Sequence, residues 1–207
     1  MPVPLFEQSV FINCPFDPKY QRLLHAIVFT TVSLGLVPRC ALETGEADLR
    51  FQHILDLLQK SKYSIHDLSR FTGEGEANLA RMNMPLELGV AIGLKLCRKR
   101  HRLVVMVQNV PEAKRKAADY EYHRFISDLS GNDPLRHQST PQSVTREVYS
   151  WLTTLDEIVN PQPSGEAIFA AFPAFQKNLA NHKKAALRKL IWNDVLKAAA
   201  ESCPKIR

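Results

Sequence analysis

The stretch KYSIHDLSRFTGEGEANLARMNMPLELGVAIGLK, residues 62–95, decides how the rest of the chain can fold. It opens with the strand-like run Tyr63–His66 and places Asp67 directly after it. A polar loop follows, and Pro85 then predicts the start of a helix, because the first helical residue needs no backbone N–H. Glu87 would be the third residue of that helix, in its first turn. We expect the two acids to meet at one edge of an α/β sheet, where ligands usually bind.

The helix predicted from Pro85 has a face of apolar and very small residues. This face consists of Leu88, Gly89, Ala91, Ile92 and Gly93. Small side chains would allow the helix to lie close against a sheet.

Predicted strands and helices alternate along the first half of the chain. Strands are expected at residues 9–14, 36–42, 62–68 and 101–108, and helices at 19–34, 48–60 and from 85. Pro38 indicates that the second strand lies at a sheet edge or begins there. With right-handed crossovers, this order predicts an α/β fold with a doubly wound parallel sheet of four to five strands.

The second half of the chain has a less regular pattern. Residues 109–140 are polar and irregular, a helix is expected from Ser143 to about Val159, and 160–165 is the best linker candidate. We therefore divide the chain into an α/β domain, 1–159, and a helical C-terminal extension, 160–207, whose clearest helix is 181–200. The extension could form a separate lobe or pack on the first domain.

Composition favours a cytoplasmic protein. The 207 residues are 45% hydrophobic and 23% charged, which is ordinary for a globular chain. Four widely spaced cysteines favour reduced thiols, and neither a signal peptide nor an apolar run long enough to span a bilayer is visible. No HExxH, GxGxxG or P-loop motif is present, so neither a metal site nor a bound cofactor is expected.

The net charge of +6 is concentrated in two stretches. Residues 98–124 and 164–207 each carry eight Lys or Arg against three acids. Such stretches could attract an anionic ligand, or could simply be solvated helix faces. The basic C-terminal segment could contact nucleic acid, although docking of its apolar residues on the main domain is favoured.

Glu87 and Asp67 are the strongest candidates for chemistry. A glycosidic bond breaks through a transition state with positive charge on the sugar, which a fixed carboxylate can stabilise or attack. The alternative is structural, because an acid in the first turn of a helix interacts favourably with the helix dipole. Spacing alone leaves both possibilities open.

Three phrases carry a family resemblance: FINCPFD (residues 11–17), SIHDLSR (64–70) and RMNMPLELGVAIG (81–93). Together they resemble nucleoside 2-deoxyribosyltransferase-like and TIR-like bacterial domains, over roughly residues 9–108. The resemblance implies a flavodoxin-like sheet and cleavage or transfer at an N-glycosidic bond of NAD or a related nucleotide or nucleoside. It also implies a setting in antiphage defence.

The resemblance assigns a role to individual residues of this chain. Glu87 would act at the anomeric carbon, and Asp67 would orient the ribose. The pocket for the base or phosphate would be lined by Asn13, with Phe16 and Asp17 beside it. Further candidates for binding substrate are Arg81, through its guanidinium group, and Asn83.

A non-catalytic module of the same fold is the rival hypothesis. TIR-like domains often self-associate, so the chain could bind a nucleotide or assemble with further copies or a regulatory partner. The small face along Gly89, Ala91 and Gly93 would then serve packing, and Glu87 would be a helix-dipole residue. We expect a homo-oligomer, a nucleotide or nucleoside ligand and no membrane association.

Overall fold

The computed structural model describes residues 6–43, 50–69, 83–109, 134–155, 158, 163–185 and 191–204. Its centre is a five-stranded parallel sheet in the order β2-β1-β3-β4-β5, so the predicted doubly wound α/β fold is confirmed. The strands are β1 (Ser9–Asn13), β2 (Val37–Arg39), β3 (Tyr63–Asp67), β4 (Arg102–Gln108) and β5 (Leu135–His137). Pro38 lies on the edge strand β2, where its missing N–H is tolerated.

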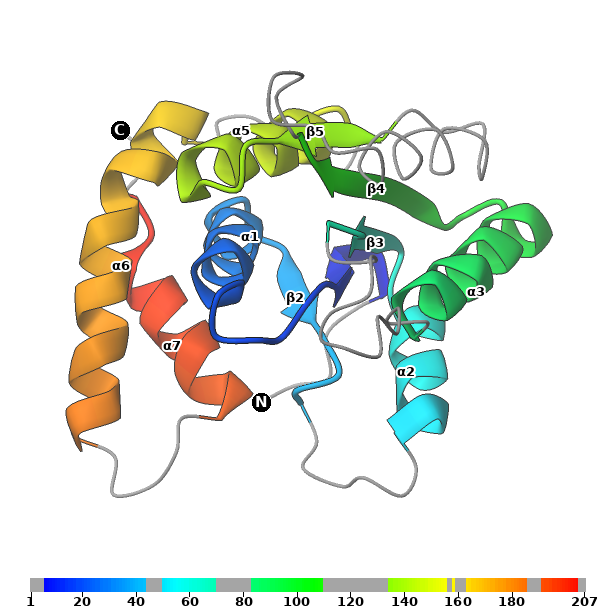
Figure 1. Cartoon of the computed structure of the whole chain (residues 1–207), viewed down its shortest axis with the longest axis horizontal. Helices are drawn as coiled ribbons and strands as arrows, with labels where there is room; N and C mark the ends of the chain where they lie inside the picture. The colour runs from blue at the N-terminus through cyan, green and yellow to red at the C-terminus, as the bar shows by residue number, and fades with distance from the viewer. Residues whose placement is uncertain are drawn as a thin grey trace, which may run out of the picture.

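Helices cover both faces of the sheet (Figure 1). A short 3-10 helix, η1 (Phe6–Gln8), precedes β1. One face is covered by α1 (Gln21–Ser33) and α5 (Pro141–Leu152), and the other by α2 (Arg50–Gln59) and α3 (Asn83–Arg98). Outside α1 lie α6 (Gly165–Ala185) and α7 (Trp192–Ser202). Within the described residues, no helix is both long and apolar enough to cross a membrane.

The two C-terminal helices are part of the main hydrophobic core. Phe172 and Phe175 of α6 and Trp192 of α7 are buried in the same cluster as Phe29 of α1. Phe29 and Phe175 stack with ring centroids 4.9 Å apart. The residues predicted as an extension therefore pack on the α/β domain.

One continuous C-terminal helix from 181 to 200 was a wrong prediction. α6 ends at Ala185, and α7 begins at Trp192 after Ile191 takes an extended conformation. The Asp194 carboxylate accepts a hydrogen bond from the Ile191 N–H at 2.9 Å, which satisfies a donor at the new helix start. Isoleucine is not a typical N-cap residue, so the residue type at position 191 does not indicate a helix start.

Helix α3 also differs from its prediction. It begins at Asn83, so Pro85 is its third residue and Glu87 lies in the second turn instead of the first. Proline is tolerated there because the first four N–H groups of a helix have no intrahelical partner. The predicted close-packing glycines are wrong as well: Gly89 is exposed, and an added Cβ at Gly89 or Gly93 would meet no atom within 4 Å.

The buried face of α3 includes Leu88 and Ala91, as predicted, but Met84 and Glu87 take the place of the two glycines. Met84, Glu87, Leu88 and Ala91 point toward the sheet. On α2, Ile54, Leu57 and Leu58 are buried, whereas Phe51 is 48% exposed. β5 was not predicted, since three residues are too few for an alternating pattern.

Truncating Phe175 tests whether α6 belongs to the same cooperative unit as the sheet. We expect Phe175→Ala to lower the free energy of unfolding by about 3–5 kcal/mol, because it removes a buried aromatic ring from the core. Urea unfolding followed by circular dichroism should show one transition. Phe51→Ala, at an exposed position, should change stability by about 0.5 kcal/mol or less. Two separate transitions would contradict a shared core.

Candidate functional site

The candidate site lies where the carboxyl ends of β1 and β3 meet. The helix after β1 covers one face of the sheet and the helix after β3 covers the other, which makes this pair the topological switch point. Ligands of open α/β sheets bind in the crevice outside such a point. Asn13 is the last residue of β1 and Asp67 the last of β3, so both predicted residues are placed at this edge.

Asp67 is enclosed by hydrogen-bond donors on the α1 side of the sheet. Its Oδ2 accepts from the Tyr20 hydroxyl and from His137 Nε2 at 2.8 Å, and its Oδ1 accepts from the Ser69 N–H at 2.8 Å and from the Ser69 hydroxyl. The residue is 0% exposed. A carboxylate offers about four lone-pair sites, so these four donors satisfy it.

The protein keeps Asp67 ionised although it is buried. Burial by itself would raise the pKa of this carboxyl, but the donors His137, Ser69 and Tyr20 together lower the pKa below its usual range. His137 Nδ1 accepts a hydrogen bond from the Ser139 N–H at 3.1 Å, so the ring hydrogen is on Nε2, facing Asp67. Asp67 therefore fixes the positions of a phenol, a hydroxyl and an imidazole at the sheet edge.

A second polar chain runs along the opposite face of β3. Asn13 Nδ2 donates to His66 Nδ1 at 3.1 Å, and His66 Nε2 contacts the Ser64 hydroxyl at 2.8 Å. The Ser64 hydroxyl contacts His101 Nε2 at 2.9 Å, and His101 Nδ1 contacts the Ser61 carbonyl at 3.1 Å. The Asn13 amide nitrogen can only donate and the Ser61 carbonyl can only accept. These two ends therefore decide which group donates and which accepts in every hydrogen bond between them.

This direction requires both ring systems to be neutral. His66 carries its hydrogen on Nε2 and His101 on Nδ1, with the Ser64 hydroxyl donating between them. Burial, with a smaller contribution from His101, lowers the pKa of His66 to about 3, and burial also lowers the pKa of His101. At neutral pH this hydrogen-bond network therefore has a single arrangement of its hydrogens.

Asn13 links this chain to the helix that carries Glu87. Its Nδ2 donates a second hydrogen bond to the Met84 carbonyl at 2.9 Å, in the first turn of α3. Glu87 is one turn further along the same buried side and is 6% exposed. The carboxamide thus fixes the position of the first turn of α3 relative to the ends of β1 and β3.

The Cys14 thiol lies within range of the charges of both predicted acids. Its pKa is raised well above the usual value, first by burial and then by the negative charges of Asp67, Glu87 and Asp17, with Cys40 also contributing. Charges on three separate elements act on one buried atom at the end of β1. Asp67 and Glu87 therefore both lie near the end of β1, Asp67 on the α1 side of the sheet and Glu87 on the α3 side.

The other predicted site residues lie in different parts of the structure. Phe16 and Asp17 line a cavity of about 440 Å³ between the β1–α1 connection and the start of α7, where Trp192 forms part of the wall. Asn83 is the exposed first residue of α3. Arg81 lies outside the described residues.

Three residues around Asp67 were not among the predicted site residues. Tyr20 precedes α1, Ser69 follows β3, and His137 ends β5. Tyr20 and Ser69 flank the predicted Asn13–Asp17 and Asp67 segments, so proximity in sequence was the only signal available. His137 lies within residues 109–140, which were predicted to be irregular. It comes to lie beside Asp67 because β5 pairs with β4 in the sheet.

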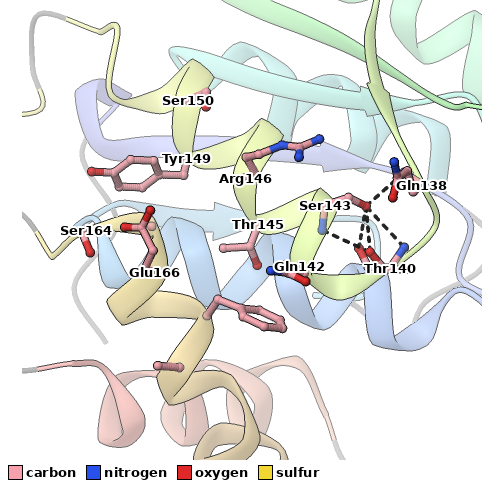
Figure 2. A pocket seen from close by; sticks show the side chains of 13 residues that line it. Gln138, Thr140, Gln142, Ser143, Thr145, Arg146, Tyr149, Ser150, Ser164 and Glu166 are labelled. Carbon is pink, nitrogen blue, oxygen red and sulfur yellow. Dashed lines mark hydrogen bonds between the residues drawn. The ribbon is translucent and has the colours of Figure 1, made fainter.

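The described residues line two further cavities. One of about 200 Å³ lies beside Asp67 and is lined mainly by polar residues, including Lys19, Ser69, Gln108 and Ser139. The larger, of about 550 Å³, lies between α5 and α6, and none of the predicted site residues lines it (Figure 2). We place the candidate active site at the switch point, because Asp67, Asn13 and the first turn of α3 meet at this edge of the sheet.

The described residues contain no group of His, Cys, Asp and Glu able to hold a metal ion. In comparisons with known proteins, no family model matches the chain and no curated protein matches it.

The buried histidine chain predicts a pH-dependent stability. The pKa of His66 is about 3 in the folded state and near 6.5 when unfolded, so between these values only the unfolded chain binds the proton. Stability therefore rises with pH across this window and is lost as pH falls, by up to about 1.4 kcal/mol per pH unit for this residue. Urea unfolding from pH 4 to 6 should show a smaller slope for His66→Gln than for the wild type. An unchanged slope would contradict the assignment.

Tyr20→Phe tests the hydrogen bond to Asp67. Removing the hydroxyl leaves a buried carboxylate oxygen with one donor fewer, which should cost about 1–3 kcal/mol of unfolding free energy. The ring volume is retained, so packing is almost unchanged. Chemical denaturation at pH 7 measures the effect, and a change below about 0.5 kcal/mol would show that the hydroxyl contributes little.

Proposed function

We propose that this chain cleaves or transfers an N-glycosidic bond of NAD or a related nucleotide or nucleoside. The observation that carries the proposal is the position of the two acids at the switch point of the sheet: Asp67 ends β3, and Glu87 lies on the buried side of α3, whose first turn is hydrogen-bonded to Asn13 at the end of β1. The resemblance to nucleoside 2-deoxyribosyltransferase-like and TIR-like domains supports the same chemistry, since it covers both acids. By that resemblance the setting would be bacterial defence.

Glu87 is the proposed catalytic residue. As the N-glycosidic bond breaks, positive charge develops on the sugar, and the carboxylate either stabilises this charge or attacks the anomeric carbon. Its burial strengthens such an interaction, because less water screens the charge. The Asn13–Met84 hydrogen bond would hold the helix so that the carboxylate keeps its place during the reaction.

Asp67 acts in this proposal as a positioning residue. Its oxygens already accept four hydrogen bonds, so it would act through the groups it holds instead of binding the ribose directly. Two of these groups, Tyr20 and Ser69, border the cavity of about 200 Å³ that is also lined by Lys19, Gln108 and Ser139. An ammonium, an amide and hydroxyls suit the phosphate and sugar hydroxyls of a nucleotide.

The base would occupy the cavity lined by Phe16 and Trp192. This cavity of about 440 Å³ combines aromatic and aliphatic walls with the carboxylates of Asp17 and Glu43. Aromatic rings favour flat, apolar faces, and carboxylates accept hydrogen bonds from exocyclic amino groups. Both cavities are lined in part by the β1–α1 connection and the start of α1, through Asp17 in one and Lys19 in the other.

A nucleotide-binding or self-assembling module of the same fold is the second candidate. Asp67 favours this candidate, because it is buried and all of its hydrogen bonds are made to protein groups, which is typical of a residue that stabilises the fold. On α3, Leu86 and Leu96 are more than half exposed beside the outward-facing Gly89. This outer face could contact a further copy of the chain.

Glu87→Gln separates the two candidates. The purified protein is incubated with NAD and with a panel of nucleosides and nucleoside monophosphates, and the products are separated chromatographically. We expect wild type to release free base and the variant to lose at least about a hundredfold in rate, because the amide carries no negative charge. Its melting temperature should stay within a few degrees of wild type.

Glu201→Gln, on the surface of α7, is the matched control and should keep full activity. Equal turnover by Glu87→Gln and wild type would exclude Glu87 as the catalytic residue. Ligand-induced stabilisation without any product from wild type would favour the binding module.

A further inference from the structure

The cavity between α5 and α6 has the features of a second ligand site. Its volume is about 550 Å³, and its walls come from the β5–α5 connection, one side of α5 and the start of α6. Figure 2 shows polar side chains of α5 along one wall and Ser164 and Glu166 at the start of α6. It shares no residue with the two cavities at the switch point.

Thr145 is the residue that points to a ligand. It is only 2% exposed and lines the cavity, yet its hydroxyl makes no hydrogen bond to any described residue. Thr30 and Thr31 of α1 behave differently, since each hydroxyl donates to the carbonyl one turn earlier at 2.8 Å. The Thr145 hydroxyl oxygen is open to the cavity, so a ligand hydroxyl there would take the place of water as its hydrogen-bond partner.

The surroundings of Thr145 can both donate and accept hydrogen bonds. Gln142 lies next to it on α5, and Gln138 contributes a second carboxamide at one end of the cavity (Figure 2). Tyr149 and Phe169 add aromatic walls. Carboxamides and hydroxyls pair well with neutral hydroxyl groups, and aromatic faces pack on the C–H surface of a ring.

The ring of Tyr149 is held in place by the backbone of α6. A Cβ added to Gly165 would lie 3.2 Å from Tyr149 Cδ1, a tight contact, so the absence of a side chain at Gly165 eases the close approach of the helix start to this ring. The approach closes one end of the cavity with a flat aromatic surface. This wall is therefore part of the fold.

Charge does not favour an ionic ligand. The two charged residues of the lining, Arg146 and Glu166, have opposite signs and are exposed. The Arg146 guanidinium already pairs with the Glu147 carboxylate at 2.8 Å. The buried part of the cavity around Thr145 is neutral.

We infer that the α5–α6 cavity binds an uncharged polyhydroxylated ring, either a free sugar or the sugar of a nucleoside. The Thr145 hydroxyl and the carboxamide of Gln142 would bind ring hydroxyls, and Tyr149 would pack against the ring. This site is separate from the proposed active site and does not depend on glycosidic cleavage. Affinity in the millimolar range is typical of a ligand with so few atoms.

Thr145→Val is the decisive variant, because valine keeps the shape and removes the hydroxyl. The full chain is titrated with D-ribose and with adenosine, and binding is followed by the amide resonances of residues around the cavity. The titration is run in the Glu87→Gln background, so that turnover at the other site does not consume the ligand. We expect saturable binding of at least one compound, weakened about fivefold by Thr145→Val and also weakened by Gln142→Leu.

The controls keep the test independent of folding and of the active site. Gln52→Leu, at an exposed position of α2, should leave binding unchanged. The melting temperature of Thr145→Val without ligand should equal or exceed that of the parent, because its hydroxyl has no protein partner; a clear fall would overturn the argument. Binding of ribose alone, or of adenosine alone, identifies the source of the ring.

Three further results would overturn the proposal. The first is the absence of saturable binding by either compound. The second is binding that Thr145→Val and Gln142→Leu leave unchanged. The third is adenosine monophosphate binding tenfold more tightly than adenosine with the same dependence on Thr145, since the site would then select an anion.

Discussion

Strand β3 carries buried polar side chains on both faces, and each of them must find a partner inside the protein. Its pleat sends Ser64 and His66 toward α3 and Asp67 toward α1. Leaving any of these groups unpaired would be costly in the interior, so elements on both sides supply matching donors and acceptors. This requirement fixes the positions of the segment before α1, the end of β5 and the start of α3 relative to the sheet edge.

The two networks differ in charge: the one on the α3 side is neutral, and the one on the α1 side contains an ionised carboxylate. On the α3 side the chain through His66 is neutral, and burial favours that state, since the pKa of His66 falls to about 3. On the α1 side Asp67 is charged, and its donors outweigh the effect of burial on its pKa. Cys14 lies near the end of β1, where Asp67, Glu87 and Asp17 all act on it. The edge is therefore locally negative in a chain of net charge +6, which suits the stabilisation of a developing positive charge.

The alternation of apolar strands and amphipathic helices was sufficient to predict the sheet and its order of elements, because burial on both faces leaves a strong pattern in the sequence. It placed Asn13 and Asp67 at the correct edge. The start of α3 was misplaced because Pro85 suits several positions in a first turn, and its glycines were assigned to the wrong side. His137 could not be linked to Asp67, since the two are 70 residues apart and β5 is only three residues long. Local pattern determines the elements, whereas side-chain partners depend on how those elements pack.

The connection between β5 and α5 contributes residues both to the surroundings of Asp67 and to the cavity between α5 and α6. His137 binds Asp67, and Ser139 lines the small cavity beside that residue and donates its N–H to His137. Gln138 and Thr140, on either side of Ser139, line the cavity between α5 and α6. Ser139 also has a positive φ of 54°, so the backbone turns sharply between these alternating side chains. A ligand that contacts Gln138 or Thr140 would therefore act on the same three-residue segment that helps to hold the imidazole against Asp67, which gives the two regions a direct covalent connection.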